Sequence, residues 1–242
     1  MHEWKLQPAK DLGLPFAKRL RSLQRESSLL ETGGHLVWWS FVRGYLGLYH
    51  RLRILGRERL PAKPPFILAA NHASHLDALV LAAPLPMRLR DRIFPIAAGD
   101  VFFETPVMSA FAAGLLNALP MWRKHCGPHA LQELRERLVT EPCAYILFPE
   151  GGRTRDGKPM PFKPGIGMLV AETGVPVIPC HLHGTFEALP PNTKWPRFRP
   201  ITLRIGEPLF FSSVANQRSG WQAIAADIGA AIQRLAPESS VQ

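Results

Sequence analysis

A histidine and an aspartate five residues apart form the first group that could carry out chemistry. They lie in residues 71–77, Asn-His-Ala-Ser-His-Leu-Asp, directly after the apolar run 66–70. A histidine can accept a proton near neutral pH, and a carboxylate can fix its tautomer and stabilise the imidazolium. Residues five apart do not share one helical face, because neighbours there are three or four apart. We therefore expect His72 in a loop and Asp77 in the first turn of the following helix.

The same segment allows other interpretations. Ser74 is a plausible N-cap, and Ser74 with Asp77 three residues later matches a capping box in which Asp replaces Glu or Gln. Asp77 could then serve only to start the helix. His75 lies closer to Asp77 in sequence and could compete with His72 as the base. His72, His75 and Asp77 could also bind zinc, although the sequence offers no further ligand pair at metal spacing.

A segment rich in glycine and arginine follows another apolar run, 143–148. Residues 148–155 are Phe-Pro-Glu-Gly-Gly-Arg-Thr-Arg. Glycine lets a backbone approach an anion closely, and arginine binds phosphate through paired hydrogen bonds. The alternative is an ordinary turn with solvated arginines. Open α/β sheets have their crevice at the carboxyl ends of the strands, so two such loops together favour a site for a phosphorylated ligand.

Short apolar runs alternate with stretches of helical pattern from residue 66 onward. The runs predict strands, and the stretches between them predict helices. Predicted strands cover 66–70, 93–98, 116–121, 143–148, 175–182 and 201–205. Predicted helices cover 78–83, 107–115, 129–139, 165–173 and 221–235. This alternation predicts an α/β fold with a mixed, largely parallel sheet flanked by helices.

The first 60 residues differ from the rest in charge and aromatic content. They hold 11 Lys and Arg but 5 Asp and Glu, in a chain with a net charge of +10. Apolar residues recur at helical spacing in 16–30 and in 35–55, with Gly33 and Gly34 between them. Basic and aromatic residues together favour an anionic lipid surface over a nucleic-acid groove. We expect residues 1–60 to form an amphipathic, membrane-interfacial helical hairpin and 61–242 to form the α/β domain.

Other features bear on the surroundings of the chain. Arg43 and His50 interrupt 35–55, whereas a spanning helix needs about 20 predominantly apolar residues. The alternative to an interfacial hairpin is that both helices pack on the core of the domain. The first twelve residues carry charges and no apolar run, which does not indicate a secretory signal. Three widely spaced cysteines argue against a disulfide framework and indicate a reducing compartment.

These motifs together resemble the glycerolipid acyltransferases typified by lysophosphatidic acid acyltransferase. The blocks of that family correspond, in family order, to 71–77, 117–123, 148–154, 162–165 and 175–179. Two positions depart from the family pattern. Asn117 replaces a glycine, and Gly152 replaces a hydroxyl residue. The likeness extends from about residue 66 to residue 182, and the agreement of successive blocks makes it specific.

The resemblance implies a role for each matched residue. His72 would be the general base and Asp77 would orient it. The substrate-binding residues, chiefly for the phosphate of the acceptor, would be Arg123, Glu150, Gly151, Arg153 and Lys163. A carboxylate repels phosphate, so we expect Glu150 to orient an arginine or to bind a hydroxyl. A strand at the acyl site would contribute Val175, Pro176, Val177 and Pro179, although a core strand is the alternative.

The implied activity is transfer of a fatty acyl group from acyl-CoA or acyl carrier protein to a lysophospholipid hydroxyl. The favoured acceptor is 1-acyl-glycerol-3-phosphate. No metal or cofactor is expected beyond the acyl thioester, and nucleic acid is not an expected partner. We expect a peripheral or monotopic protein on the cytoplasmic face of a membrane.

Three alternatives stay open from the sequence. The two departures at Asn117 and Gly152 would also allow glycerol-3-phosphate or another lyso-lipid as the acceptor. A non-catalytic basic protein could bind membrane or nucleic acid through residues 1–60. A metal hydrolase could use His72, His75 and Asp77.

Overall fold

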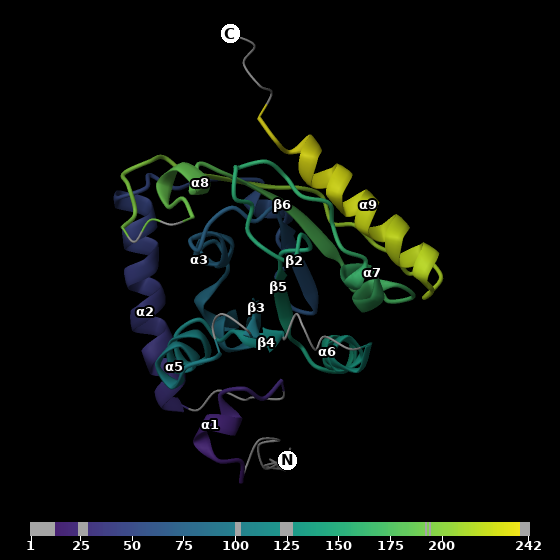
Figure 1. Cartoon of the computed structure of the whole chain (residues 1–242), viewed down its shortest axis with the longest axis horizontal. Coiled ribbons are helices and arrows are strands. Elements are labelled where there is room, and N and C mark those ends of the chain that lie inside the picture. The colour runs from purple at the N-terminus through teal and green to yellow at the C-terminus, as the bar shows by residue number, and fades with distance from the viewer. Residues whose placement is uncertain are drawn as a thin grey trace, which may run out of the picture.

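The computed structural model describes residues 13–23, 29–99, 103–121, 128–191, 193 and 195–237. Within these residues the chain builds one seven-stranded sheet with helices on both sides (Figure 1). The strands are β1 (Arg53–Leu55), β2 (Phe66–Ala70), β3 (Ile93–Ala98), β4 (Leu119–Met121), β5 (Ala144–Leu147), β6 (Val177–His183) and β7 (Thr202–Ile205). Their order across the sheet is β1-β7-β6-β2-β5-β3-β4.

The direction of the strands confirms the predicted α/β class. Strands β6, β2, β5, β3 and β4 are parallel to one another. Strand β7 is antiparallel to β6, and β1 is parallel to β7. The sheet is therefore mixed and mostly parallel. Because β6, β2 and β5 are parallel neighbours, the segments that follow them emerge at the same edge of the sheet.

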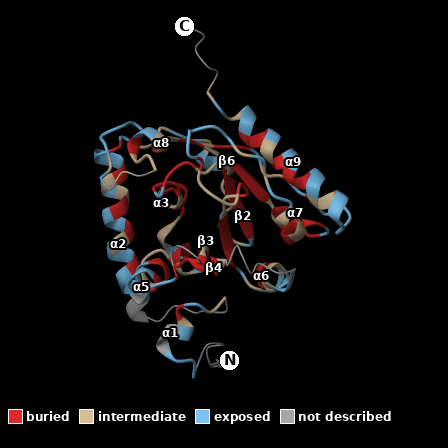
Figure 2. Ribbon diagram, viewed as in Figure 1, coloured by how far each residue is buried: buried red, intermediate tan, exposed pale blue. Residues whose placement is uncertain are grey.

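Both faces of the sheet are covered, which explains the continuous apolar runs in its strands. The main helices are α2 (Leu29–Leu48), α3 (Asp77–Ala82), α5 (Pro106–Gly114), α6 (Pro128–Thr140), α7 (Gly165–Val170), α8 (Thr185–Ala188) and α9 (Arg218–Arg234). In β2, Phe66 and Leu68 pack in a cluster with α2 and α3, while Ile67 packs with α6, α7 and α9. Figure 2 shows the resulting buried stripes on α2 and α9.

The N-terminal segment departs from its prediction. A break at Gly33 and Gly34 was expected, but α2 runs through both glycines from Leu29. Each glycine costs a helix about 1 kcal/mol relative to alanine. Burial of an apolar side chain contributes about 1.5–3 kcal/mol, and α2 buries Trp39, Val42 and Leu46 in the core. Packing therefore outweighs the cost of the two glycines.

The predicted helix 35–55 also ends too late. Helix α2 stops at Leu48, Arg51 has a φ of 45°, and Arg53–Leu55 form β1 beside β7. A residue with positive φ cannot continue a right-handed helix, which accounts for the end of α2. Of the predicted helix 16–30, the structure describes α1 (Phe16–Arg19), a turn to residue 23 and two residues that belong to α2. A helical hairpin is therefore not shown.

Helix α2 packs on the domain with one face and exposes the other. The Arg43 guanidinium donates to the backbone carbonyls of Ala83 and Leu85, at the end of α3. On the opposite face, Val37 is 75% exposed and Phe41 is 64% exposed. Among the helices of the described ranges, none has both the length and the apolar content to span a bilayer. The division into an interfacial 1–60 and an α/β domain 61–242 stays a prediction, although β1 joins the sheet.

Candidate active site

The histidine and the aspartate of the first motif are in direct contact. His72 lies in the loop after β2, and Asp77 is the first residue of α3, as the spacing predicted. The Nδ1 atom of His72 lies 2.8 Å from Oδ2 of Asp77, whose side chain is completely buried. A carboxylate can only accept here, so Nδ1 donates and the neutral ring leaves Nε2 unprotonated. His72 is therefore oriented as a base whose accepting atom is Nε2.

Two other histidines, His35 and His50, make a similar carboxylate or carbonyl contact, but both of their ring nitrogens are engaged. His35 pairs its Nδ1 with Asp91 at 2.7 Å, and its Nε2 lies 2.8 Å from the carbonyl of Gly114. His50 is held by the carbonyl of Arg199 and the hydroxyl of Tyr45. Within the described residues, no hydrogen bond to Nε2 of His72 is found, and its side chain is 19% exposed. Availability of Nε2 thus separates His72 from the structural histidines.

Asp77 also shapes the loop that carries His72. Its Oδ2 accepts hydrogen bonds from the backbone N–H groups of Ala73 (2.7 Å) and Ser74 (2.8 Å). The contact with the Ser74 N–H is half of a capping box, so helix initiation and orientation of His72 coexist. Leu76 is the residue directly before α3, but the Ser74 hydroxyl accepts from the N–H of Leu76 at 3.2 Å, as an N-cap side chain does, and donates to the carbonyl of Leu189.

The loop after β5 closes around the backbone and ring of His72. The ring of Phe148 stacks on the imidazole, with centroids 4.0 Å apart and an interplanar angle of 14°. The N–H of Thr154 donates to the carbonyl of His72 at 2.9 Å. Stacking and backbone pairing together fix the plane of the imidazole, as a general base requires.

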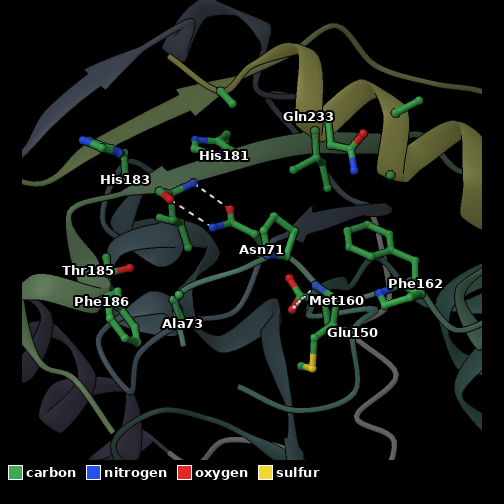
Figure 3. Close-up of a pocket in the computed structure, with 18 of the residues that line it drawn as sticks. Asn71, Ala73, Glu150, Met160, Phe162, His181, His183, Thr185, Phe186 and Gln233 are labelled. Atoms are coloured by element: carbon green, nitrogen blue, oxygen red, sulfur yellow. Dashed lines mark hydrogen bonds between the residues drawn. The ribbon is translucent and has the colours of Figure 1, made fainter. Parts of the chain in front are cut away.

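The side chain of Glu150 contacts the backbone of the loop that carries His72. Its carboxylate is buried, with Oε1 accepting from the N–H of His72 at 3.0 Å and Oε2 from the N–H of Met160 at 3.3 Å. Burial raises the pKa of Glu150, and these two hydrogen bonds oppose the rise. The expected arginine or hydroxyl partner is not among its described hydrogen bonds. Glu150 therefore joins the loop after β5 to the loop after β2, and Figure 3 shows its second contact, with Met160.

Two cationic side chains, Arg153 and Lys163, belong to the same part of the chain as Glu150. Gly151 has a φ of 74°, and a Cβ there would lie 2.5 Å from Nζ of Lys163, so glycine makes room for the ammonium. Arg153 is partly buried, and this burial lowers its pKa while the charge of Asp77 raises it. Arg153 thus lies within electrostatic reach of Asp77, and Lys163 lies beside Gly151 in the loop after β5. Arg123 lies outside the described residues.

The departure at Asn117 has a structural explanation. Asn117 adopts a φ of 54°, in the left-handed region that glycine enters most easily and asparagine next. Its buried amide group donates to the backbone carbonyls of Arg90 (3.4 Å) and Ile93 (3.2 Å). Asparagine therefore preserves the backbone conformation that the family glycine would allow.

The predicted acyl-site strand begins in the core. Val177 and Pro179 belong to β6 and pair with Ile67 and Ala69 of β2, while Val175 is buried just before the strand. The carbonyl of Pro176 accepts from the N–H of Ile67. These residues precede the edge at which His72 emerges, so their assignment to an acyl site stays a prediction. The later part of β6 lies closer to the loop of His72, because the side-chain amide of Asn71 pairs with both the N–H and the carbonyl of Leu182.

The carboxyl end of β6 and the residues after it belong to none of the motifs found in the sequence. His181, His183 and Thr185 line a cavity of about 740 Å³ that also reaches Asn71, Ala73 and Glu150 (Figure 3). Only the His-x-His pattern at 181–183 could have drawn attention to this segment, and without the parallel pairing of β6 with β2 it has no evident link to His72.

The zinc alternative finds no support in the geometry of the described residues, and the described cysteines are poorly suited to act as nucleophiles. Across the described ranges, no three His, Cys, Asp or Glu side chains form a group that could hold a metal ion. Cys143 and Cys180 are buried, as expected, and burial raises the pKa of Cys143 to about 11. Cys126 lies outside the described residues. A thiol with a raised pKa is a poor nucleophile at neutral pH.

His181 should make the protein less stable in acid. Burial, helped by the charges of His183 and Arg204, lowers the pKa of His181 from 6.5 to about 4. The unfolded chain binds the proton more readily, so the free energy of unfolding should fall as the pH decreases from about 6.5 to about 4. Denaturant titrations across this range would measure the slope. The slope should be shallower in His181→Gln, and less so in His183→Gln, because His183 supplies only part of the shift; equal slopes in all three proteins would contradict the assignment.

Known proteins share sequence with this chain. A family model described as Acyltransferase matches residues 51–183, more than half of the chain. The human 1-acyl-sn-glycerol-3-phosphate acyltransferase beta is 30% identical over 184 residues, covering 73% of this chain and 64% of that protein. The alpha form of Mus musculus is 30% identical over 131 residues, covering 53% of this chain and 44% of that protein. The chain thus spans from under half to nearly two thirds of these relatives.

A solved structure has a similar fold. The crystal structure of the 1-acyl-sn-glycerophosphate (LPA) acyltransferase PlsC from Thermotoga maritima matches with a TM-score of 0.63 and 25% sequence identity. The match covers 83% of this chain and 77% of the other. The family model spans the loop of His72 and the loop of Glu150 alike. The chain belongs to the acyltransferase family.

Proposed function

We propose that this protein transfers a fatty acyl group from acyl-CoA or acyl carrier protein to the free hydroxyl of 1-acyl-glycerol-3-phosphate, forming phosphatidic acid. The observation that carries the proposal is the buried Asp77 holding His72 through Nδ1 while Nε2 has no described partner. This is the arrangement that a general base needs. The names of the human, mouse and Thermotoga maritima relatives support the choice of acceptor.

The reaction needs one proton acceptor and no acyl-enzyme. The acceptor hydroxyl attacks the thioester carbonyl while its proton passes to Nε2 of His72. A new acyl–oxygen bond forms, the acyl–sulfur bond breaks, and the imidazolium returns the proton to the leaving thiolate. The charge of Asp77 stabilises the imidazolium between these steps. General-base assistance of this kind contributes about 10²–10⁴-fold to the rate.

The acceptor phosphate would bind to the cationic side chains beside the base. Arg153 and Lys163 follow β5 in the chain, where Glu150 ties the loop to His72 and Gly151 leaves room for the ammonium of Lys163. Arg123 follows β4 and would join them on the grounds of the family resemblance. Guanidinium and ammonium groups match the charge of phosphate, and guanidinium also matches its geometry. Another lyso-lipid with a phosphate would use the same cations, which makes it the alternative acceptor.

The membrane surface would be contacted by an apolar face formed by α2 and α5. Its members are exposed apolar side chains of the two helices: Leu36, Val37, Phe41, Leu48, Val107, Met108 and Phe111. The ring of Trp38 contacts both Phe41 and Phe111, with centroids 6.0 Å apart in each pair, so the face is continuous. Exposed apolar patches of this kind mark interaction sites. We assign this face to a lipid surface, on the cytoplasmic side as the resemblance implies.

Phe41→Asp should weaken membrane binding without unfolding the protein. Phe41 is 64% exposed, so its replacement removes little from the core. Loss of one large apolar side chain and gain of a charge should reduce binding to vesicles of anionic phospholipid about tenfold or more. Co-sedimentation would measure the change. Val139→Asp, at a 54% exposed position on α6, is the matched control and should bind normally. Equal binding of all three proteins would contradict the assignment.

A panel of acceptors tests the choice of substrate. The purified protein would be mixed with labelled acyl-CoA and, separately, with 1-acyl-glycerol-3-phosphate, glycerol-3-phosphate and lysophospholipids with other head groups. Mass spectrometry would then identify the acylated product. We expect phosphatidic acid to form fastest. Faster acylation of another acceptor in the panel would change the proposed acceptor and would not contradict the proposed role of His72.

A further inference from the structure

An open cavity of about 740 Å³ lies between the loop of His72 and α9 (Figure 3). Its walls come from the carboxyl end of β6, from α8, from residues 157–164 and from α9. One end reaches Asn71 and Ala73, on either side of His72 in sequence. The described residues that line it include no lysine and no arginine. The cavity therefore differs from the cationic group at Arg153 and Lys163, and its lining is not suited to a phosphate.

Two buried polar atoms of the cavity have no partner in the described structure. Thr185 is 1% exposed, and its hydroxyl makes no hydrogen bond; in Figure 3 this hydroxyl points into the cavity. The Nδ1 atom of His181 is also buried without a partner. Burial lowers the pKa of His181 to about 4, so its ring is neutral at pH 7. Buried polar groups are nearly always hydrogen-bonded, which indicates that an uncharged polar ligand completes them.

The rest of the lining combines apolar and polar side chains. Helix α9 presents small residues to the cavity, including Ala226, Gly229 and Ala230, so its backbone can be approached closely. Phe162 stands over Gly229, where a Cβ would lie 3.7 Å from the ring. Phe186 forms part of the opposite wall. A lining of this mixed kind, without a lysine or an arginine, suits a flexible, uncharged chain that carries hydrogen-bonding groups.

We propose that this cavity binds the pantetheine arm of the acyl donor. Pantetheine is an uncharged chain with two amides and hydroxyl groups, and its sulfur carries the acyl group in both acyl-CoA and acyl carrier protein. The arm would place its amides near Thr185 and His181 and its thioester at the Ala73 end, beside His72. The charged remainder of either donor would stay outside the cavity. This assignment rests on the proposed function and names the donor site of the same centre.

Two substitutions and a control test the assignment kinetically. Ala230 is exposed and lines the cavity, so Ala230→Trp places a large side chain in it. Ala223 is an exposed residue of α9 that does not line the cavity, so Ala223→Trp is the control. We expect Ala230→Trp to raise the KM for acyl-CoA and for acyl carrier protein about tenfold, with an unchanged KM for the acceptor. Thr185→Val should raise the donor KM about 3–10-fold, the effect of one hydrogen bond. Ala223→Trp should behave as wild type.

Direct binding separates this assignment from the proposed function. Calorimetric titration with pantetheine, on the full chain carrying His72→Ala, needs no turnover. Ala230→Trp should weaken pantetheine in that background, while binding of adenosine 3′,5′-bisphosphate should stay the same. A rise in the acceptor KM alone, a defect confined to long acyl chains, or pantetheine binding unaffected by Ala230→Trp would overturn the assignment. Absence of acyl transfer in the wild type, with pantetheine still bound in the cavity, would instead overturn the proposed function.

Discussion

Replacing His72 with alanine should lower kcat for acyl transfer by about 10²–10⁴-fold and leave the protein folded. In the proposed reaction the imidazole accepts the proton of the acceptor hydroxyl, and within the described residues His72 is the histidine whose ring pairs with Asp77. Its side chain lies at the edge of the sheet, stacked on Phe148, and is not part of the hydrophobic core. Initial rates with labelled acyl-CoA would measure the loss, and thermal unfolding would verify the fold.

His75→Ala is the matched control for His72→Ala. His75 lies in the same loop, is more exposed, and could have been the base on sequence grounds alone. The structure pairs Asp77 with Nδ1 of His72 at 2.8 Å. His75→Ala should therefore keep activity within a few-fold of wild type. If His75→Ala lost activity and His72→Ala kept it, the two histidines would have to exchange roles.

Asp77→Asn should also lower kcat strongly, by about 10²–10⁴-fold, with little change in the KM of the donor. Oδ2 accepts from His72 and from the N–H groups of Ala73 and Ser74 together. An amide oxygen in that place would keep the backbone contacts but would carry no charge to stabilise the imidazolium. The reversed amide would present N–H groups to Nδ1 and impose the wrong tautomer. Steady-state kinetics on both substrates would measure the change.

Asp91→Asn provides the comparison for Asp77→Asn. Asp91 holds His35 at 2.7 Å in a second His–Asp pair, but Nε2 of His35 is engaged by the carbonyl of Gly114. Asp91→Asn should alter stability and leave kcat within a few-fold of wild type. An equal loss of kcat in the two variants would show that the Asp77 effect is structural, which would contradict the assigned role.

The strands of the sheet were predictable because their apolar runs are short and bounded by turns. Residues 66–70 and 93–98 form β2 and β3 with the expected limits, and helices begin within a few residues of their predicted starts. Strand β1 was missed because Arg53–Leu55 is only three residues long and exposed at its ends, so it has no apolar pattern. Helix α2 was divided at its glycines because local propensity does not register the core that Trp39 and Leu46 enter.

The candidate site was predictable to the extent that it lies in local motifs. The five-residue spacing placed His72 in a loop and Asp77 at a helix start, and both are confirmed. The partner of Glu150 was not predictable, because it is the backbone of His72, 78 residues away, which the pairing of β2 with β5 brings near. Thr185 and His181 were missed for the same reason, since β6 reaches the site only through its pairing with β2.

The stoichiometry of acyl transfer tests the central claim most directly. The purified protein would receive isotope-labelled acyl-CoA and 1-acyl-glycerol-3-phosphate, with released thiol and labelled phosphatidic acid counted in the same sample. We expect one labelled phosphatidic acid for each thiol released by the wild type, and a loss of both in His72→Ala. Thiol release without a labelled lipid, or equal amounts of product from wild type and His72→Ala, would contradict acyl transfer with His72 as the base.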